Sequence, residues 1–100
     1  MSINEKKLRN DFEAYLRGED PDELATAPRL DEWVPAITRA LNGNRVMTLV
    51  GLVTSHPTLT DGRRIETSPL VWLDRKGRWA RTMSRVYELG KPAGARESEV

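Results

Sequence analysis

The sequence predicts an α+β domain, in which an N-terminal helix and one or two short helices pack on a small antiparallel sheet of about three strands. Three observations predict this class. Apolar residues at helical spacing occupy residues 1–44, whereas β-branched residues in alternating patterns dominate from residue 45 onward. Turn signals, Asp61-Gly62 and the segment 74–78, separate the apolar runs of the second half.

The first element is predicted to be a helix over residues 3–17. Ser2 and Glu5 have the spacing of a capping box, and Gly18 stands where a helix ends. One apolar stripe follows helical spacing and is made of Leu8, Phe12, Tyr15 and Leu16. This stripe is predicted to pack on the core.

One or two short helices are predicted to follow. Asp20 caps a segment in which Pro21 takes the first helical position, and one or two turns of helix end before Pro28. The next segment is ambiguous, but its apolar residues suit a helical stripe: Leu30, Trp33, Val34, Ile37 and Leu41. Because Pro35 is tolerated only in a first turn, the second short helix is placed over residues 32–41.

Three strands are predicted in the second half of the chain. Residues 45–55 are apolar on both alternating faces, and Gly51 in their middle indicates a bulge or a close approach by another backbone. Residues 65–73 form the second strand, with Pro69 at an edge or a bulge. Residues 79–90 also fit helical spacing, but their β-branched content and the preceding turn favour a third strand.

Length and composition set the domain organisation and exclude several classes of function. A chain of 100 residues is one domain, placed over residues 1–90, and the polar segment 91–100 is predicted to be a disordered tail. With no cysteine and one histidine, the chain is not expected to hold zinc or another metal, and it has no nucleotide or cofactor motif. No apolar run reaches about 18 residues and the N-terminus is too polar for a signal peptide, so a cytoplasmic protein without a membrane span is predicted.

Charge is distributed unevenly along the chain. The net charge is +1, but residues 1–44 carry −3, residues 45–91 carry +5 and residues 92–100 carry −1. The acidic front and the basic back either attract each other within the fold or present a basic face to an anionic partner.

The segment 56–70 holds a candidate polar site. The residues of this site are His56, Asp61, Thr67 and Ser68. A small hydrolase-like enzyme centred on His56 would need a neighbouring nucleophile and an orienting carboxylate, and no G-x-S-x-G elbow surrounds any serine. The favoured interpretation of His56 is therefore a strand-end residue that bonds to nearby backbone, and no catalytic residue is assigned.

Basic and aromatic side chains alternate after the second predicted strand. The candidate partner-binding residues are Arg63, Arg64, Arg75, Lys76, Arg78, Trp79, Arg81, Arg85 and Tyr87. On a strand, Trp79, Arg81 and Arg85 share one face, and because two guanidinium groups in a core would need partners, this face is predicted to point at water. The alternatives are that Trp72 and Trp79 pair across a hairpin and that the arginines are only solvated.

The residues also resemble a known family. The pattern HP-x-L-x-DG-x-x-I-x-TS is followed by LD and then by WART-x-SR-x-Y-x-LG, and the match extends over residues 28–90. This core is similar to a family of small, uncharacterised proteobacterial proteins, described as a domain of unknown function. The resemblance implies a bacterial or phage origin and favours the strand over residues 79–90. It implies no activity.

Together these observations predict a non-catalytic binding or regulatory module whose partner is a macromolecule. A protein partner is favoured, with the chain acting as an inhibitor or accessory factor. The alternative is nucleic-acid binding through the basic aromatic face over residues 72–87, in which bases stack on the aromatic rings. A homodimer is a further alternative, because exposed strand edges invite pairing.

Overall fold

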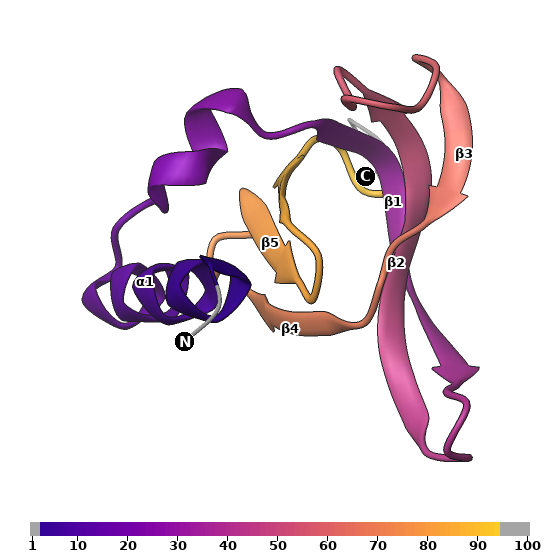
Figure 1. Ribbon diagram of the computed structural model, residues 1–100. Coiled ribbons are helices and arrows are strands. Elements are labelled where there is room, and N and C mark those ends of the chain that lie inside the picture. The colour runs from indigo at the N-terminus through magenta and orange to yellow at the C-terminus, as the bar shows by residue number, and fades with distance from the viewer. Residues whose placement is uncertain (1–2, 95–100) are drawn as a thin grey trace, which may run out of the picture.

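The computed structural model describes the backbone of residues 3–94 and the side chains of residues 5–94. The described part contains one α-helix, one 3-10 helix and a six-stranded sheet (Figure 1). Its elements are α1 (Ile3–Arg17), η1 (Asp22–Thr26), β1 (Arg29–Arg39), β2 (Arg45–Thr54), β3 (Arg63–Glu66), β4 (Leu70–Leu73), β5 (Trp79–Thr82) and β6 (Val86–Leu89). The predicted sheet of about three strands with several helices is wrong, because the protein is mostly sheet.

The sheet is mixed and strongly curled. Its strand order is β3-β2-β1-β6-β5-β4, and every neighbouring pair is antiparallel except β1 and β6, which run parallel. The curl places β4, β5 and β6 between α1 on one side and β1 with β2 on the other (Figure 1). Strands β5 and β6 are therefore covered on both faces.

The short helix predicted over residues 32–41 is wrong, because these residues belong to the long strand β1. Three residues close to Pro35 are β-branched and favour an extended backbone: Val34, Ile37 and Thr38. A bulge between Asp31 and Val34, where Glu32 has a φ of 50°, disturbs the alternation that would have identified the strand.

The other predicted strands exist but are divided differently. The predicted strand over residues 65–73 is two strands, β3 and β4, and Pro69 lies directly before β4 at the edge of the sheet. The segment 79–90 is extended, not helical, but reverses after Thr82 so that β5 pairs with β6. The helix over residues 3–17 is confirmed, and η1 occupies the turn of helix predicted before Pro28.

Two apolar layers result from the curl. The inner layer, enclosed by the sheet, is made of Leu30, Leu49, Val53, Ala80, Tyr87 and Leu89. The outer layer lies under α1, where the ring centroid of Tyr15 is 6.3 Å from that of Trp79 and that of Phe12 is 5.3 Å from that of Trp72. The predicted cross-strand pairing of the two tryptophans is replaced by packing of both rings against the helix.

Gly51 is required where β2 passes the bulge of β1. A Cβ atom at this position would lie 2.8 Å from the backbone oxygen of Asp31 and 2.8 Å from Cγ of Leu30. The predicted close approach by another backbone is therefore confirmed. We expect Gly51→Ala to lower the free energy of unfolding by about 1–2 kcal/mol, because the bulge must shift to admit the methyl group. Urea unfolding measures this, and a loss below about 0.5 kcal/mol would show that the bulge yields freely.

Part of the predicted termini lies outside the described residues. Ser2 of the predicted capping box and residues 95–100 of the predicted tail are not described. The segment before residue 95 is bonded to the bulge of β1: the N–H of Glu32 donates to the carbonyl of Lys91, at 2.7 Å, and the N–H of Ala93 donates to the carbonyl of Trp33, at 2.8 Å.

Candidate functional site

The predicted basic aromatic face does not point at water. Trp79 and Arg81 lie on the side of β5 that packs toward α1, and neither side chain is exposed by more than 1%. Tyr87 belongs to the inner apolar layer. The prediction of one solvent-facing surface is therefore wrong, because the curl covers one side of β5 and β6 with the helix and the other with β1 and β2.

Arg81 joins the acidic front of the chain to its basic back. Its Nη1 donates to Oδ2 of Asp11 on α1, at 2.8 Å, and to Oε1 of Glu23 on η1, at 3.3 Å. Burial, together with the negative charge of Glu23, raises the pKa of Asp11 to about 6 and outweighs the opposite effect of Arg81. Of the two roles proposed for the charge asymmetry, attraction within the fold is the one that this cluster performs.

The other predicted basic residues are dispersed. Arg78 is paired at the surface with Asp20, at 3.0 Å, and with Asp74, at 3.1 Å. Burial pushes the pKa of Asp74 upward, but the hydrogen bonds and charge of Arg78 more than offset this effect and hold that pKa below its usual range. The guanidinium of Arg75 stacks over the ring of Tyr15, with 5.7 Å between Cζ and the ring centroid.

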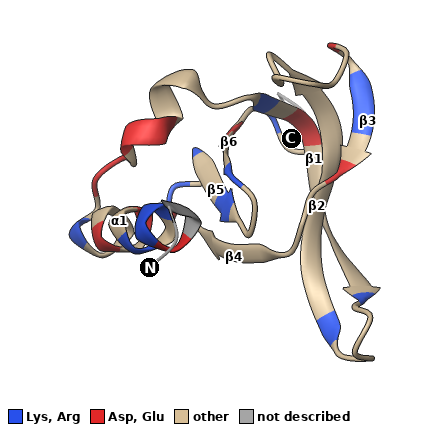
Figure 2. Ribbon diagram, in the orientation of Figure 1, with Lys and Arg blue, Asp and Glu red and all other residues tan. Residues whose placement is uncertain are grey.

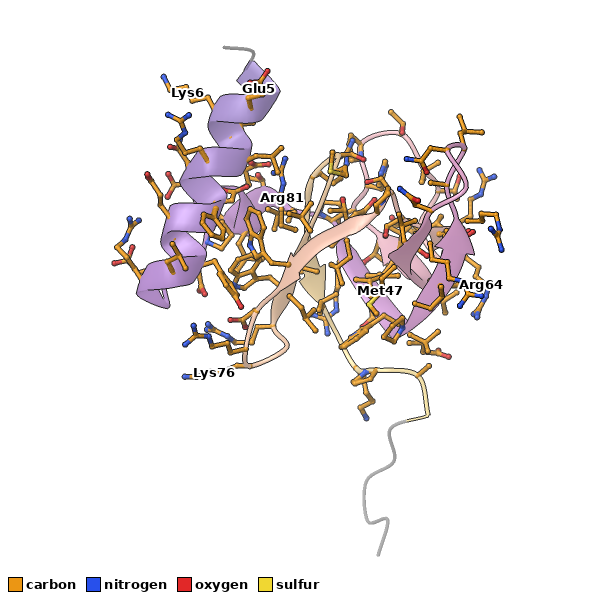
Figure 3. All side chains as sticks on the ribbon, turned by 90° about the horizontal axis from the view of Figure 1, so that it is seen from below. Glu5, Lys6, Met47, Arg64, Lys76 and Arg81 are labelled. Carbon is orange, nitrogen blue, oxygen red and sulfur yellow. The ribbon has the colours of Figure 1, made fainter. Side chains whose placement is uncertain are left out.

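Lys76 and the arginines of β3 do not share a surface. Lys76 lies in the turn between β4 and β5, whereas Arg63 and Arg64 begin β3 at the other edge of the sheet. Figure 3 shows Lys76 and Arg64 far apart. Arg85, partly buried before β6, is a neighbour of His56, and burial of the imidazole, together with the charge of Arg85, lowers the pKa of His56. The nine predicted residues therefore form no single contact surface.

The four residues of the predicted polar site serve local structure. His56 accepts a hydrogen bond through Nδ1 from the N–H of Thr58, at 3.1 Å, and Asp61 accepts one through Oδ1 from the N–H of Ser55, at 2.9 Å. Among the hydrogen bonds of residues 5–94, none joins His56 to Asp61, Thr67 or Ser68.

Thr67 and Ser68 stabilise the crossing from β3 to β4. The Thr67 hydroxyl accepts from the N–H of Leu49, at 3.1 Å, and donates to the carbonyl of Ser68, at 2.8 Å. The Ser68 hydroxyl lies 2.6 Å from that of Ser84 and accepts from the Ser84 N–H. These contacts fix the backbone, and neither hydroxyl is bonded to the imidazole in the described part of the chain; the hydroxyl that lies near Nδ1 of His56, at 3.4 Å, is that of Thr58.

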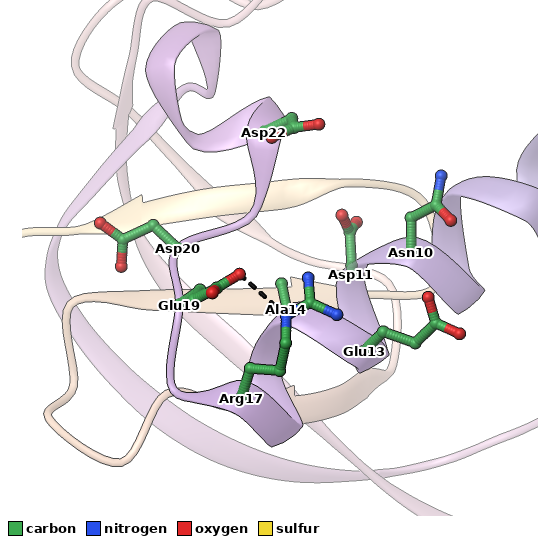
Figure 4. A pocket seen from close by; sticks show the side chains of 8 residues that line it. All are labelled: Asn10, Asp11, Glu13, Ala14, Arg17, Glu19, Asp20 and Asp22. Atoms are coloured by element: carbon green, nitrogen blue, oxygen red, sulfur yellow. Dashed lines mark hydrogen bonds and ion pairs between the residues drawn. The ribbon is translucent and has the colours of Figure 1, made fainter.

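The acidic front forms a hollow beside the C-terminal end of α1. Its lining residues are Asn10, Asp11, Glu13, Ala14, Arg17, Glu19, Asp20 and Asp22 (Figure 4). Two of these residues, Arg17 and Glu19, form an ion pair, with 2.9 Å between Nε and Oε1. In the described part of the chain, no three histidine, cysteine or acidic side chains are arranged to hold a metal ion. None of the described helices is long and apolar enough to cross a bilayer.

A projecting hairpin is the surface that sequence reasoning missed. We call residues 34–48 the arm; they are the far halves of β1 and β2 with their connecting turn, and they extend beyond the rest of the sheet (Figure 1). Three apolar side chains are well exposed there: Ile37 at 61%, Met47 at 42%, and Leu41 fully exposed in the turn. The side chain of Val34, also on the arm, is 39% exposed.

One face of the arm continues the inner apolar layer outward. Pairs of residues that face each other across β1 and β2 lie on the same side, and along this face they are Pro35 with Leu49, Ile37 with Met47, and Arg39 with Arg45. Leu49 is fully buried in the inner layer. The face therefore runs from the core, through an exposed apolar pair, to two facing arginines.

The arm also has open strand edges. The N–H of Ala40 donates to the carbonyl of Asn44, so residues at even spacing from Ala40 bond across the hairpin. Ile37 and Arg39 consequently direct their backbone groups at the outer edge of β1. On β2, the strand β3 pairs only from Val50 onward, so within the described chain residues 45–48 have no neighbouring strand except β1.

Charge sets the arm apart as well. Residues 33–60 contain no aspartate or glutamate, and they include Arg39 and Arg45. Figure 2 shows basic positions near the free end of β1 and β2, whereas acidic positions lie around α1 and η1, on the other half of β1 and at β3. This uninterrupted non-acidic run, with Pro35 inside an apparent helix, is the signal that could have revealed the arm in the sequence.

Comparison with known proteins places the chain in a family but assigns no activity. The model of a family of unknown function, DUF6634, matches residues 3–100. The chain belongs to this family. No curated protein and no solved structure matches this DUF6634 protein significantly.

Proposed function

We propose that this DUF6634 protein is a non-catalytic binding module whose partner is a protein that packs on the arm. The observation that carries the proposal is the exposed apolar pair Ile37 and Met47, with Leu41 at the tip, on a hairpin that projects from the body. Contiguous exposed apolar side chains rimmed by polar ones mark interaction sites. Burying such side chains in a partner is also the main source of binding free energy at protein interfaces.

The geometry favours this partner over the alternative through residues 72–87. Nucleic-acid binding there needs aromatic rings on which bases stack, and Trp79 and Tyr87 are buried on opposite sides of the same hairpin. We further propose that the chain is of bacterial or phage origin and acts in the cytoplasm as an inhibitor or accessory factor. The resemblance of its core motif and the lack of cysteine support this part of the proposal.

A paired capture experiment tests the role of the arm. Tagged wild type and the double variant Ile37→Ser, Met47→Ser are purified from a bacterial host after nuclease treatment, and captured proteins are then reconstituted with each form. We expect one protein to bind the wild type in a defined ratio and to bind the double variant at least tenfold more weakly, because about 1.4 kcal/mol or more of apolar burial is lost.

The matched control is Val71→Ser, which removes an exposed apolar side chain of β4, at 40% exposure, away from the arm. Val71→Ser should bind like the wild type. Equal binding by wild type and the arm variant would contradict the proposal. A wild-type dimer in light scattering that the arm variant abolishes would also contradict it, because the occupant would be a second copy of the chain.

A further inference from the structure

We infer that Arg39 and Arg45 form a carboxylate clasp at the end of the arm, so that the protein partner contributes an acidic segment. This inference rests on the proposed function and adds the chemistry of the partner. The two arginines face each other across β1 and β2 on the same side as Ile37 and Met47. The segment expected there therefore carries apolar side chains beside at least one carboxylate.

The position of the two arginines is expected to lower the stability of the free protein. Like charges directly opposite on neighbouring strands destabilise a hairpin. Nη1 of Arg39 donates to the carbonyl of Gly43, at 3.1 Å, and the side chain of Arg45 has no hydrogen bond or ion pair with any residue of the described chain. No acidic residue between positions 33 and 60 neutralises them. A bound anion between them would remove the repulsion.

The surroundings of Arg39 and Arg45 favour a protein carboxylate over the other possible anions. A guanidinium group matches the planar carboxylate with two parallel hydrogen bonds. Arm-to-arm pairing of two copies would bring two more arginines to the same place, and Pro35 removes an N–H from the outer edge of β1. Affinity for nucleic acid comes largely from many lysine and arginine contacts with phosphates, whereas the arm offers two cations next to an apolar pair.

The first test measures the repulsion itself. We expect Arg45→Gln to raise the Tm of the free protein by about 1–4 °C, because one of two facing charges is removed. In the Arg39→Gln background the same substitution should leave the Tm unchanged, since no facing charge remains. A lower Tm in the wild-type background, or the same shift in both backgrounds, would overturn the clasp.

The second test identifies the anion. A fluorescein-labelled 12-residue peptide of alternating glutamate and leucine, the same peptide with glutamine, and a 20-base-pair DNA duplex are titrated against the protein. Binding of the glutamate peptide, at least tenfold tighter than the glutamine peptide and weakened about tenfold by Arg45→Gln, supports the inference. Equal affinity for both peptides overturns it, as does preferential binding of the duplex or no binding of any probe.

Failure of the clasp can be told apart from failure of the proposed function. If a captured partner loses affinity for the Ile37→Ser, Met47→Ser variant but binds Arg45→Gln like the wild type, the arm binds protein and the carboxylate clasp is wrong. If neither variant changes partner binding, both ideas are wrong.

Discussion

Replacing Arg81 with methionine is expected to lower the free energy of unfolding by about 3–5 kcal/mol, the largest effect of any single substitution considered. The substitution keeps most of the side-chain volume but removes the cation that lies between Asp11 and Glu23. Asp11 would then be a buried carboxylate without its guanidinium partner, since its exposure is 4%. The whole free energy of unfolding of a domain is about 5–15 kcal/mol, so the variant would be marginally folded. Urea unfolding followed by tryptophan fluorescence measures the loss.

Arg78→Met is the matched control for this prediction. Arg78 also has two carboxylate partners, Asp20 and Asp74, but its side chain is 48% exposed. Solvent screens exposed ion pairs, so this variant should lose less than about 1 kcal/mol. Combining Arg81→Met with Asp11→Asn should recover part of the loss, because the stranded carboxylate is removed. Equal losses for Arg81→Met and Arg78→Met would show that burial of the cluster contributes little.

The same cluster explains why the face of residues 79–89 that carries Trp79 and Arg81 was wrongly predicted to point at water. Alternation along residues 79–89 places Trp79 and Arg81 on one face, and a face with guanidinium groups is usually solvated. Here two carboxylates reach the buried guanidinium from α1 and η1, which are about 60 to 70 residues away in the sequence. Such a tertiary partner has no local signature, so sequence pattern alone could not separate an exposed arginine from a buried, paired one.

Local signals predicted local features well. The helix over residues 3–17, the strand containing Gly51 and the turn role of Asp61-Gly62 follow from spacing and backbone chemistry, and the structure contains all three. The strand β1 was missed because the bulge at Glu32 breaks its alternation and makes the apolar residues mimic a helical stripe. The parallel pairing of β1 with β6 depends on the curl of the whole sheet, which no short pattern encodes.

The arm and the buried cluster divide the arginines into two roles. Arg81 stabilises the fold through carboxylates of the same chain, whereas Arg39 and Arg45 face each other with no acidic residue nearby in the sequence. Facing cations lower the stability of the free protein. This contrast is the physical reason why we propose a binding role for the arm, whereas the cluster stabilises the fold.

Lowering the pH from 7 to 4 is expected to stabilise the wild type relative to Asp11→Asn by on the order of 2–3 kcal/mol. Burial and the charge of Glu23 raise the pKa of Asp11 from its ordinary value of 3.8 to about 6. The folded protein therefore binds this proton more tightly than the unfolded chain does. The resulting contribution to the free energy of unfolding is fully present below about pH 4 and is lost as the pH rises through 6.

Comparison with Asp11→Asn is needed because His56 has the opposite effect. Burial and the charge of Arg85 lower the pKa of His56, so its protonation destabilises the folded protein as the pH falls below 6.5. Both proteins contain His56, and its effect cancels in the difference between their urea unfolding curves at each pH. Glu23→Gln should reduce the gain but not remove it, because burial, the largest cause of the raised pKa, remains. If the difference in free energy of unfolding between wild type and Asp11→Asn stays constant between pH 4 and 7, Arg81 keeps Asp11 ionised throughout this range.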